Sequence, residues 1–571
     1  MIGYLFAIEH GAKVIYDTDD DNKPIYKGLQ QFDYNGIFTG MMYDESQNES
    51  VSVFNPYAFF GRPDIWPRGF PLSRIQIPNN VTQLKLCLSL PIPLIQQGLV
   101  DKDPDVDGIY RLMHAHPVDG LNEKFNEHAP PVAVEIGVFS PFNSQNTLFH
   151  YNSFFTLALP IGVTSRVTDI WRGFFAQKLV HLVGGRLGFY PVNAIQNRNP
   201  HNYLDDFEDE TALYYEVDSL IEKLTLWNCT RPSIEDCTIE LSELFVNNGF
   251  WPKYNHDLIT AWLADLSNVG YKFPHLLLEN VDKAVFRCHV APQTFKVLTR
   301  EERIFAKRTN CKRFLDWCDP TNNQMYSVEP VLKPELGHQL SRMVLIVTFN
   351  IPITAYASLI QLMYNGFFAH TIFCGTVDNT TFVENEFFPQ LSKEQSFFYL
   401  TKKEMRQGYF AYLCTAKAIE MRVQNIDGYI TLADDAIFNF FNKVDYSFFR
   451  GVDNLNAAKI GWTWWTETEV GQNALFNVTE SIRMEMSADP NSDLAKAFTV
   501  FDNLTEGNGF KYLESPDAWM ISDWYYLPKT YDWVFAELAE VMNRFKFFHE
   551  LAIPRLGAGF GHKDVFVEEK S

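Results

Sequence analysis

The sequence predicts an α/β protein built from two units, and three observations support this class. Short apolar runs rich in β-branched residues alternate along the chain with amphipathic helices, which is the order of an α/β fold. Two of these runs, 14–16 and 428–433, end in clustered aspartates. The chain has 571 residues, 46% of them hydrophobic and 15% aromatic, so it can form more than one large core.

Charge and cysteine content narrow the class of protein further. The net charge of −22 and the isoelectric point near 5.1 argue against nucleic-acid binding and suit a soluble protein that approaches phosphates through a metal ion. The eight cysteines form no Cys-x-x-Cys pair, but Cys229/Cys237 and Cys311/Cys318 are close enough for local disulfides. The even cysteine count and six Asn-x-Ser/Thr sequons favour a secretory lumen weakly.

The first acidic turn comes early in the chain. A helix is predicted over 3–10, and the run Val14-Ile15-Tyr16 predicts a buried strand. The turn after this strand contains four aspartates within five residues, Asp17, Asp19, Asp20 and Asp21. Ligands bind at the carboxyl ends of strands in open α/β sheets, and clustered carboxylates repel one another unless a cation separates them. Oxygen-only ligands favour Mg²⁺, Mn²⁺ or Ca²⁺.

A calcium loop of the EF-hand type can be excluded for this turn. Its sixth position is Asn22, where glycine is needed, and its twelfth is Gly28, where glutamate is needed. An Asp-x-Asp turn that holds a divalent ion against a diphosphate remains, and this is the motif of metal-dependent nucleotide-sugar glycosyltransferases. A solvated acidic turn explains the same residues about equally well.

Three later features of the first unit are further candidates. The proline-rich loop 61–71 could present Trp66 and Arg68 to a base and a phosphate, although a structural tryptophan and a surface arginine are the simpler interpretation. Asp169 opens a helix, where it could be an N-cap, orient an acceptor or act as a base. His201 lies in a polar loop and could bind metal or phosphate, or simply be exposed.

The second unit repeats the pattern in a weaker form. Prolines cluster before a strand at 344–349, which suggests a domain over 1–325, a linker over 326–340 and a second domain over 341–560. Asp434-Asp435 follows the strand at 428–433 without a third aspartate. Adjacent residues of an extended chain face opposite ways, so we expect a weak or absent metal site unless Asp523 or His549-Glu550 adds ligands. Three tryptophans over 462–465 could form a sugar-stacking platform or pack in a core.

The order of several motifs resembles the STELLO-type family of glycosyltransferase-like proteins. The matching stretches are Ile2-Gly-Tyr-Leu, Gly11 to Asn22, Phe54-Asn-Pro-Tyr57, Trp66-Pro-Arg-Gly69, Val167 to Arg172 and Gly428-Tyr-Ile. The first half is also distantly similar to reversibly glycosylated polypeptides and UDP-arabinopyranose mutases. Asp19-Asp20-Asp21 and Asp169-Ile-Trp171 occupy the places of their Asp-Asp-Asp and Asp-Ile-Trp motifs.

The resemblance implies a type-A glycosyltransferase fold, which is Rossmann-like, for the first unit and a related α/β fold for the second. It also implies Golgi membranes, a UDP-sugar donor and a glycan or protein acceptor. Asp19 and Asp21 would then hold Mn²⁺ or Mg²⁺, with Asp17 and Asp20 in support and His201 as a possible further ligand. Asp169 would serve the acceptor, and Trp66 and Arg68 would contact the nucleotide. A non-catalytic scaffold that organises other glycan-synthesising enzymes is the alternative.

The front of the chain leads to a further expectation. A type-A glycosyltransferase normally reaches its Asp-x-Asp strand only after several β-α units, each of roughly 30 residues or more. Only sixteen residues precede Asp17, and the membrane anchor of the resembled family does not stand upstream. We therefore expect a shortened isoform or incomplete gene model, an unpaired sheet edge at Val14-Ile15-Tyr16, and poor donor binding.

Overall fold

A computed structural model of the chain divides into two compact units, Met1–Pro292 and Gln293–Ser571. The structure describes residues 1–45, 51–80, 83–116, 118–198, 201–277, 287–288, 339–350, 357, 360, 364, 366–376, 396–406, 408–436, 446–451, 468–514 and 522–561. The predicted linker 326–340, the tryptophans of 462–465 and Cys311/Cys318 lie wholly or almost wholly outside these residues. The exact domain boundary therefore stays a prediction.

Unit 1 is built on a nine-stranded mixed sheet. Its strand order is β1-β9-β6-β10-β7-β3-β5-β11, and β2 pairs with β10. The strands are β1 Val14–Thr18, β2 Asn22–Pro24, β3 Ile37–Tyr43, β5 Leu84–Pro91, β6 Ile95–Asp101, β7 Val132–Val134, β9 Asn146–His150, β10 Leu187–Gln196 and β11 Arg287–Cys288. Strands β6 and β10 are parallel neighbours at its centre. Strand β1 is at the end of this order and pairs only with β9 among the described strands, so the predicted sheet edge is confirmed.

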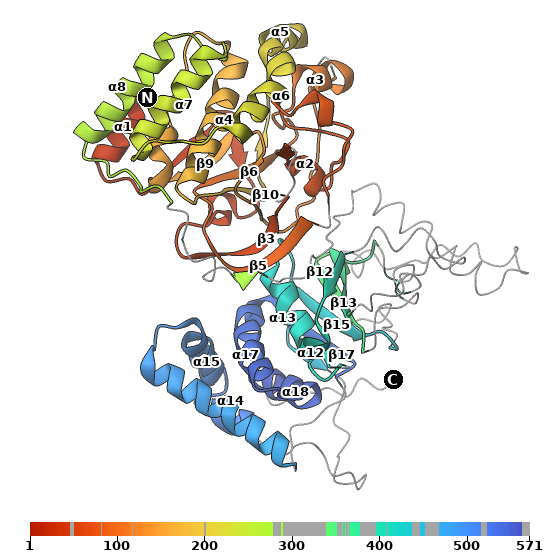
Figure 1. Cartoon of the computed structure of the whole chain (residues 1–571). Coiled ribbons are helices and arrows are strands. Elements are labelled where there is room, and N and C mark those ends of the chain that lie inside the picture. Colours follow the sequence, from red (N-terminus) through yellow and green to blue (C-terminus); the bar gives the residue numbers. More distant parts are fainter. Residues whose placement is uncertain are drawn as a thin grey trace, which may run out of the picture. The chain divides into compact units, whose positions relative to one another are not determined.

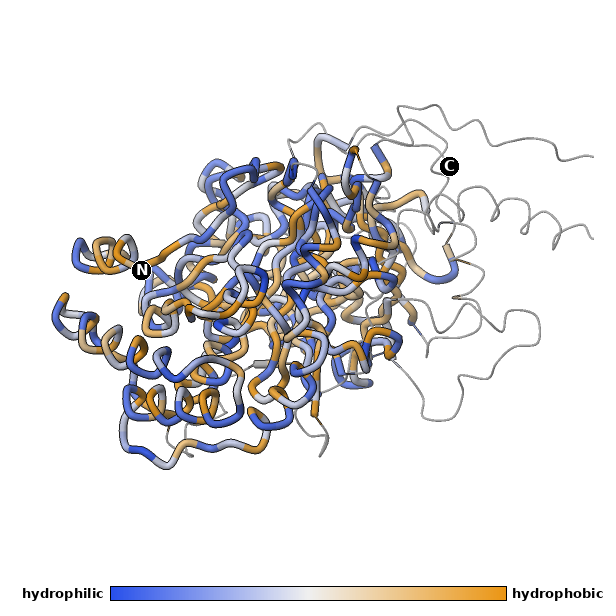
Figure 2. The backbone as a smooth tube through the Cα atoms, turned by 90° about the horizontal axis from the view of Figure 1, so that it is seen from above, coloured by the Kyte–Doolittle hydropathy of each residue, from blue (hydrophilic) through white to orange (hydrophobic). Residues whose placement is uncertain are grey.

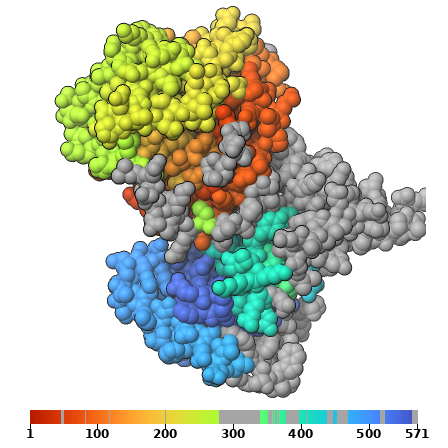
Figure 3. Space-filling view, viewed as in Figure 1, coloured from red at the N-terminus to blue at the C-terminus, as the bar shows by residue number. Residues whose placement is uncertain are grey.

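Helices pack around this sheet (Figure 1). They are α1 Ile2–Glu9, α2 Pro56–Phe59, α3 Gly108–His114, α4 Ser165–Leu182, α5 Tyr203–Asp209, α6 Thr211–Leu226, α7 Ile234–Asn247 and α8 Tyr254–Asn268. Helix α6 has apolar residues at 3–4 spacing, and these are buried. In the space-filling view the yellow-green helices α6, α7 and α8 cover one face of unit 1 (Figure 3). Hydrophobic and hydrophilic residues alternate along the coiled segments of the backbone (Figure 2).

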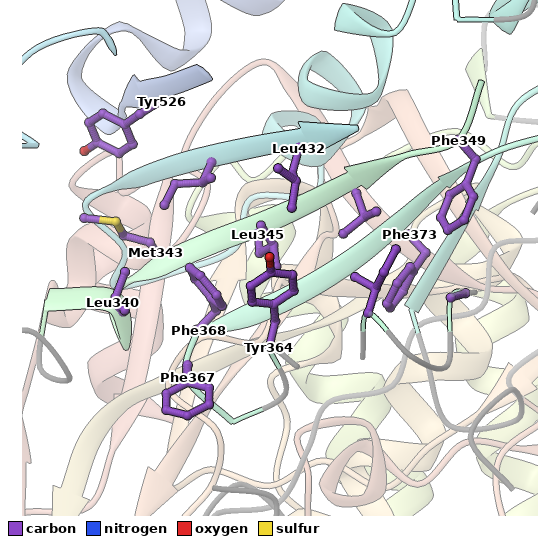
Figure 4. Close-up of a cluster of buried hydrophobic side chains, with 14 of the residues drawn as sticks. Leu340, Met343, Leu345, Phe349, Tyr364, Phe367, Phe368, Phe373, Leu432 and Tyr526 are labelled. Carbon is purple, nitrogen blue, oxygen red and sulfur yellow. The ribbon is translucent and has the colours of Figure 1, made fainter. Parts of the chain in front are cut away.

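Unit 2 is built on a six-stranded sheet in the order β14-β13-β12-β15-β17-β16. The strands are β12 Met343–Thr348, β13 His370–Gly375, β14 Ser396–Tyr399, β15 Gly428–Ala433, β16 Arg450–Gly451 and β17 Trp524–Pro528. The first four in this order are parallel, whereas β17 is antiparallel to both of its neighbours. Tyr364, Phe367 and Phe368 lie against the strands beside Leu345 and Phe373 in one buried cluster (Figure 4).

Seven helices are described in unit 2, namely α12 Lys402–Met405, α13 Tyr412–Glu420, α14 Glu469–Ala488, α15 Asp493–Leu504, α16 Gly509–Leu513, α17 Asp532–Arg544 and α18 His549–Phe560. Helix α13 packs beside α17 (Figure 1). Helices α12 and α13 are separate because Arg406 has φ +40° and ends α12. Pro554 lies inside α18.

Disulfides join three pairs of the described cysteines. Cys229 pairs with Cys237, as predicted, while Cys87 pairs with Cys288 and Cys374 with Cys414. The last two pairs are distant in sequence, and so spacing could not reveal them. Within the described part of the chain, no helix is both long and apolar enough to span a bilayer.

Candidate functional site

The acidic turn of unit 1 lies at the carboxyl edge of the central strands. Strands β6 and β10 run towards this edge, and β1 also ends there because both β1 and β6 are antiparallel to β9. The turn between β1 and β2 carries Asp19, Asp20 and Asp21, and β2 pairs with the end of β10. The predicted position at a carboxyl edge is therefore confirmed. Strand β1 itself is less buried than predicted, since Ile15 is its only buried residue.

One amide brings two of the predicted metal ligands together. The Nε2 atom of Gln196 donates to Asp19 Oδ2 at 2.8 Å and to Asp21 Oδ1 at 2.9 Å. Gln145 Nε2 donates in turn to Gln196 Oε1 at 2.7 Å, which fixes the amide orientation. Burial raises the pKa of Asp19, and the charges of Asp105 and Asp21 raise it further. Asp20 is exposed at the tip of the turn.

Asp17 does not share in this arrangement. Its Oδ1 atom accepts a hydrogen bond from the Tyr4 hydroxyl at 2.7 Å, and its Oδ2 atom lies 3.6 Å from an Arg172 nitrogen. Arg172 is fully buried between the rings of Phe142 and Phe149. Asp17 is thus paired with the buried guanidinium of Arg172 and supports the turn from inside the protein.

Arg68 and Asp169 form a buried ion-pair cluster with Asp105. Arg68 donates to Asp105 through Nε at 2.8 Å and through a terminal nitrogen at 2.7 Å, and to both oxygens of Asp169 at 3.0 Å. Burial opposes ionisation of Asp105, but the charge of Arg68 outweighs it and lowers the pKa of Asp105. The prediction that Arg68 lies on the surface is therefore wrong, because its guanidinium donates to the carboxylates of Asp105 and Asp169 inside the protein.

Trp66 has the position of its simpler prediction, whereas Asp169 is not the N-cap of its helix. Trp66 is buried and donates from Nε1 to Asp107 Oδ2 at 2.6 Å, so it is a structural tryptophan and not a plane presented by the loop. Asp169 lies in the second turn of α4, whose N-cap is Thr164. Its carboxylate accepts from Arg68 and from the backbone N–H of Ser144 at 3.2 Å.

His201 belongs to a second cluster. Its Nε2 atom lies 2.7 Å from Asp206 Oδ2, and Arg111, Arg166 and Arg198 also approach this carboxylate at 3.6–3.9 Å. Burial acts to raise the pKa of Asp206, but these cations lower it. The hydrogen bonds and ion pairs of the described residues thus place His201 with Asp206, and its role as a metal ligand stays a prediction.

Sequence reasoning missed the residues that hold this edge together. Alternating aspartates follow β6 directly, at Asp101, Asp103, Asp105 and Asp107, and all four are buried. Asp103 pairs with Arg111 at 2.6 Å, and Asp107 caps α3 by accepting from the backbone N–H of Tyr110 at 2.8 Å. The signal was an Asp-x-Asp-x-Asp-x-Asp run after the apolar residues 98–100.

Unit 2 carries its acidic residues at the carboxyl ends of two central parallel strands. Strands β12 and β15 are neighbours, and Asp434 follows β15 with its N–H bonded to the Thr348 carbonyl at 2.9 Å. Asp523 precedes β17, and its carbonyl accepts from the N–H of Ala433 at 2.7 Å. Three carboxylates, those of Asp434, Asp435 and Asp523, therefore gather at one edge. Asp435 and Asp523 are exposed and Asp434 is half-buried.

The charge of Asp435 acts on both other carboxylates of unit 2, and Asp434 also accepts a hydrogen bond from the backbone N–H of Asn350. Burial raises the pKa of Asp434, and the charge of Asp435 raises it further. The same two causes raise the pKa of Asp523. No lysine or arginine of the described residues forms an ion pair with any of them. Asp434 and Asp435 lie in a turn and not in a strand, so the predicted opposite facing of adjacent residues does not apply.

His549 does not join this group. It is buried, its Nδ1 accepts from the backbone N–H of Tyr412 at 3.0 Å, and Nε2 lies 3.3 Å from the Ser522 carbonyl. Burial lowers the pKa of His549 to about 4, so the ring is neutral at pH 7. The expectation that it could supply a ligand is therefore wrong. Across the described ranges, no group of three or more histidine, cysteine or acidic side chains is already arranged as a metal site.

The family model of the STELLO glycosyltransferases matches residues 166–300 and 311–521. The chain belongs to this family. Two proteins of Arabidopsis thaliana, "Probable glycosyltransferase STELLO1" and "Probable glycosyltransferase STELLO2", are 34% and 33% identical to it over 288 residues. The aligned residues make up 49% of this chain and 37% of each of those relatives, so the chain spans well under half of their length.

The STELLO match covers some of the acidic residues at the carboxyl edges of the two sheets and leaves out others. The matched residues include Asp169 in unit 1 and Asp434 and Asp435 in unit 2, but they do not include the turn at 19–21. The mixed α/β architecture of both units agrees with the predicted Rossmann-like glycosyltransferase fold. The predicted family and fold class are thus confirmed.

Proposed function

We propose that the protein transfers a sugar from a nucleotide-sugar donor to a glycan or protein acceptor, and that the donor diphosphate binds at the carboxyl edge of the unit 2 sheet. The observation that carries this proposal is the position of Asp434 and Asp435. They follow the strand at which the order of parallel strands reverses, since β13 and β14 lie on one side of β12 and β15 lies on the other. Ligands of open α/β sheets bind at this switch point.

The order of elements also favours unit 2. A type-A glycosyltransferase reaches its acidic turn after several β-α units, and in unit 2 the strands β12, β13 and β14 precede β15. In unit 1 the turn at 19–21 lies beside β1, at the end of the described strand order. The acidic turn of unit 2 instead follows a strand at the centre of its sheet, with the strand context of the resembled fold.

The carboxylates of unit 2 fit a hard divalent cation. Mn²⁺ and Mg²⁺ prefer oxygen ligands, and the mutual repulsion of Asp434, Asp435 and Asp523 would be relieved by one such ion. The bound ion would act as a Lewis acid that stabilises the leaving nucleoside diphosphate. Asp434 and Asp435 would hold the ion, and the exposed Asp523 would be the third carboxylate of the donor site.

The turn of unit 1 remains a second candidate for the metal, because Gln196 already brings Asp19 and Asp21 to one atom. The pairing of Arg68 with Asp105 and Asp169 leaves these three side chains to support the edge, and not to bind the donor.

The disulfides and the exposed sequon residues Asn80, Asn228 and Asn503 support our proposal of a Golgi lumen.

The test compares isosteric double variants of the full chain in transfer assays with a panel of UDP- and GDP-sugars and Mn²⁺. Asp434→Asn/Asp435→Asn should lower turnover by about a hundredfold or more, the size expected for loss of electrostatic stabilisation of a leaving group. Asp19→Asn/Asp21→Asn should keep turnover within a few-fold. The reverse ranking would move the donor site to unit 1.

A non-catalytic scaffold is the second candidate function, and one observation favours it. The ion pairs of unit 1 form a closed network in which Arg68, Arg111 and Arg166 are each already paired with carboxylates. A unit of this kind could be retained in the protein because its surface binds other enzymes, and not because it catalyses a reaction. Absence of transfer and hydrolysis with every donor, together with stable capture of a glycan-synthesising enzyme, would favour this function.

A further inference from the structure

Unit 2 contains a pocket at the end of its sheet opposite to Asp434 and Asp435. Its volume is about 290 Å³, close to the lower limit for small-ligand sites. It is lined by Phe448, Leu504, Thr505, Glu506, Asn508, Tyr512, Tyr531 and residues 558–561. Neither the family match nor the proposed donor site gives this pocket a role.

The topology separates this pocket from the proposed donor site. Tyr531 comes directly after β17, whose end pairs with the beginning of β15, and Phe448 precedes β16, which runs in the same direction as β15. Both rings therefore lie at the amino edge of the parallel strands. Asp434 lies at the other end of β15, a strand of six residues and so roughly 20 Å long.

Aromatic rings form the apolar part of the pocket. Tyr531 stacks on Phe560 with centroids 5.2 Å apart and an angle of 12°. Phe448 is 37% exposed, which is unusual for a large ring, and Tyr512 is half-buried. The faces of such rings carry negative electrostatic potential and attract cations.

The polar part of the pocket consists of acceptors. Asn508 uses its Nδ2 to donate to the carbonyls of Thr505 and Glu506 at 3.0 and 3.2 Å, which leaves its Oδ1 as an acceptor. Glu506 adds an exposed carboxylate and is held at φ +55°, an uncommon conformation for a residue with a side chain. Helices α15 and α18 both end here, and the C-terminal end of a helix carries partial negative charge.

We propose that this pocket binds an organic cation, the guanidinium or ammonium group of a basic side chain on a partner protein. Aromatic faces, a carboxylate, an amide oxygen and the C-termini of two helices line the pocket, and against these the short helix α16 and helix α17 begin at the lining residues Asn508 and Tyr531. Among the described residues, no lysine, arginine or histidine lines the pocket. The net charge of −22 would steer a basic partner towards the protein. This inference is independent of the proposed donor site.

The test uses the full chain and two probes of nearly equal shape. Nα-acetylarginine amide carries a guanidinium group, whereas Nα-acetylcitrulline amide carries a neutral urea in its place. Saturation-transfer NMR and titration calorimetry should detect binding of the arginine probe only, weakened by added salt. Equal binding of both probes, or binding of a neutral monosaccharide in preference to the arginine probe, would overturn the proposal. A short peptide that contains arginine and binds at least tenfold more tightly than the arginine probe would identify a protein as the source of the cation. A peptide with the same affinity as the probe would identify a free small cation.

Two variants with matched controls locate the binding. Glu506→Gln should weaken the arginine probe about fivefold, the value of an exposed charge pair of about 1 kcal/mol, whereas Glu222→Gln on α6 should not change it. Phe448→Ala should weaken it by a similar factor, whereas Phe476→Ala, which removes an exposed ring of α14, should not. All four residues are exposed, so folding is expected to be intact. Unchanged affinity in both pocket variants would place the cation elsewhere.

Discussion

Both units of the molecule gather aspartates at the carboxyl edge of a sheet, but they balance the negative charge differently. In unit 1, Asp105 and Asp169 meet Arg68, and Asp103 meets Arg111, inside the protein, whereas Asp19 and Asp21 accept from the amide of Gln196. In unit 2, the described aspartates at the edge form no ion pair with a lysine or arginine of the described residues, and Asp434 accepts from the backbone N–H of Asn350. The comparison teaches that clustered aspartates alone do not identify a metal site, because cations inside the protein can already balance their charge. Carboxylates without such a counter-charge gain more from an added cation.

Removal of a paired acid in unit 1 should have the largest effect on stability. Asp105→Asn leaves Arg68 with one carboxylate partner in a buried site, which should cost about 3 kcal/mol of unfolding free energy. Urea unfolding of the full chain measures the loss, and hydrogen exchange of α4 assigns it to unit 1. The control Asp265→Asn removes an exposed charge from α8 and should change stability by less than about 0.5 kcal/mol. Equal losses in the two variants would show that the buried pairs do not stabilise unit 1.

Removal of an acid of unit 2 that has no cationic partner among the described residues should change stability in the opposite direction. Asp435→Asn relieves the repulsion of Asp434 and Asp523, so the metal-free protein should gain about 0.5 kcal/mol. The measurement is hydrogen exchange of β15 and β17 in the presence of a chelator. Lower protection in the variant would mean that Asp435 has a stabilising partner, and the contrast between the units would then fail.

Acidification should give the smallest effect on stability. Because the pKa values of Asp434 and Asp523 are raised above those of the unfolded chain, the folded state binds more protons. The contribution of these two groups to metal-free stability should therefore rise as the pH falls from 7 towards the unfolded carboxyl pKa of about 3.9. Asp105, whose pKa is lowered, should lose its contribution only below that value.

The measurement for this pH effect is hydrogen exchange of β15 at pH 7 and pH 5, corrected for intrinsic exchange rates. We expect slightly greater protection at pH 5 in the wild type and a smaller change in Asp435→Asn. An equal change in both proteins would show that other groups cause it.

Much of the fold followed from local patterns in the sequence. The strands β12 and β15 are apolar runs in which threonine is the only polar residue type, and α6 shows the spacing of an amphipathic helix. Strands β3 and β6 were not recognised. Strand β6 contains Gln96 and Gln97, which are buried because each finds a hydrogen-bond partner on another strand or loop. Periodicity does not reveal such partners.

The candidate site was predicted in position but not in detail. The carboxyl edges of the sheets and the aspartates at 17–21 and 434–435 were visible as strand-to-turn boundaries. The burial of Arg68 was not, because its partners Asp105 and Asp169 lie 37 and 101 residues away in sequence. The order of strands that makes β12 and β15 neighbours was equally beyond local patterns, since the described strands β13 and β14 and the helices α12 and α13 lie between them in sequence.

The most direct test of this account is Mn²⁺ binding to the full chain with UDP present, measured by titration calorimetry and by the loss of free-Mn²⁺ electron paramagnetic resonance signal. We predict that wild type and Asp19→Asn/Asp21→Asn bind Mn²⁺ with the same affinity. Asp434→Asn/Asp435→Asn should weaken binding by about tenfold to a hundredfold, as expected when two of the ligands lose their charge. Unchanged binding in the unit 2 variant and loss in the unit 1 variant would contradict the central claim that the carboxylates at the edge of the unit 2 sheet hold the metal of the donor site.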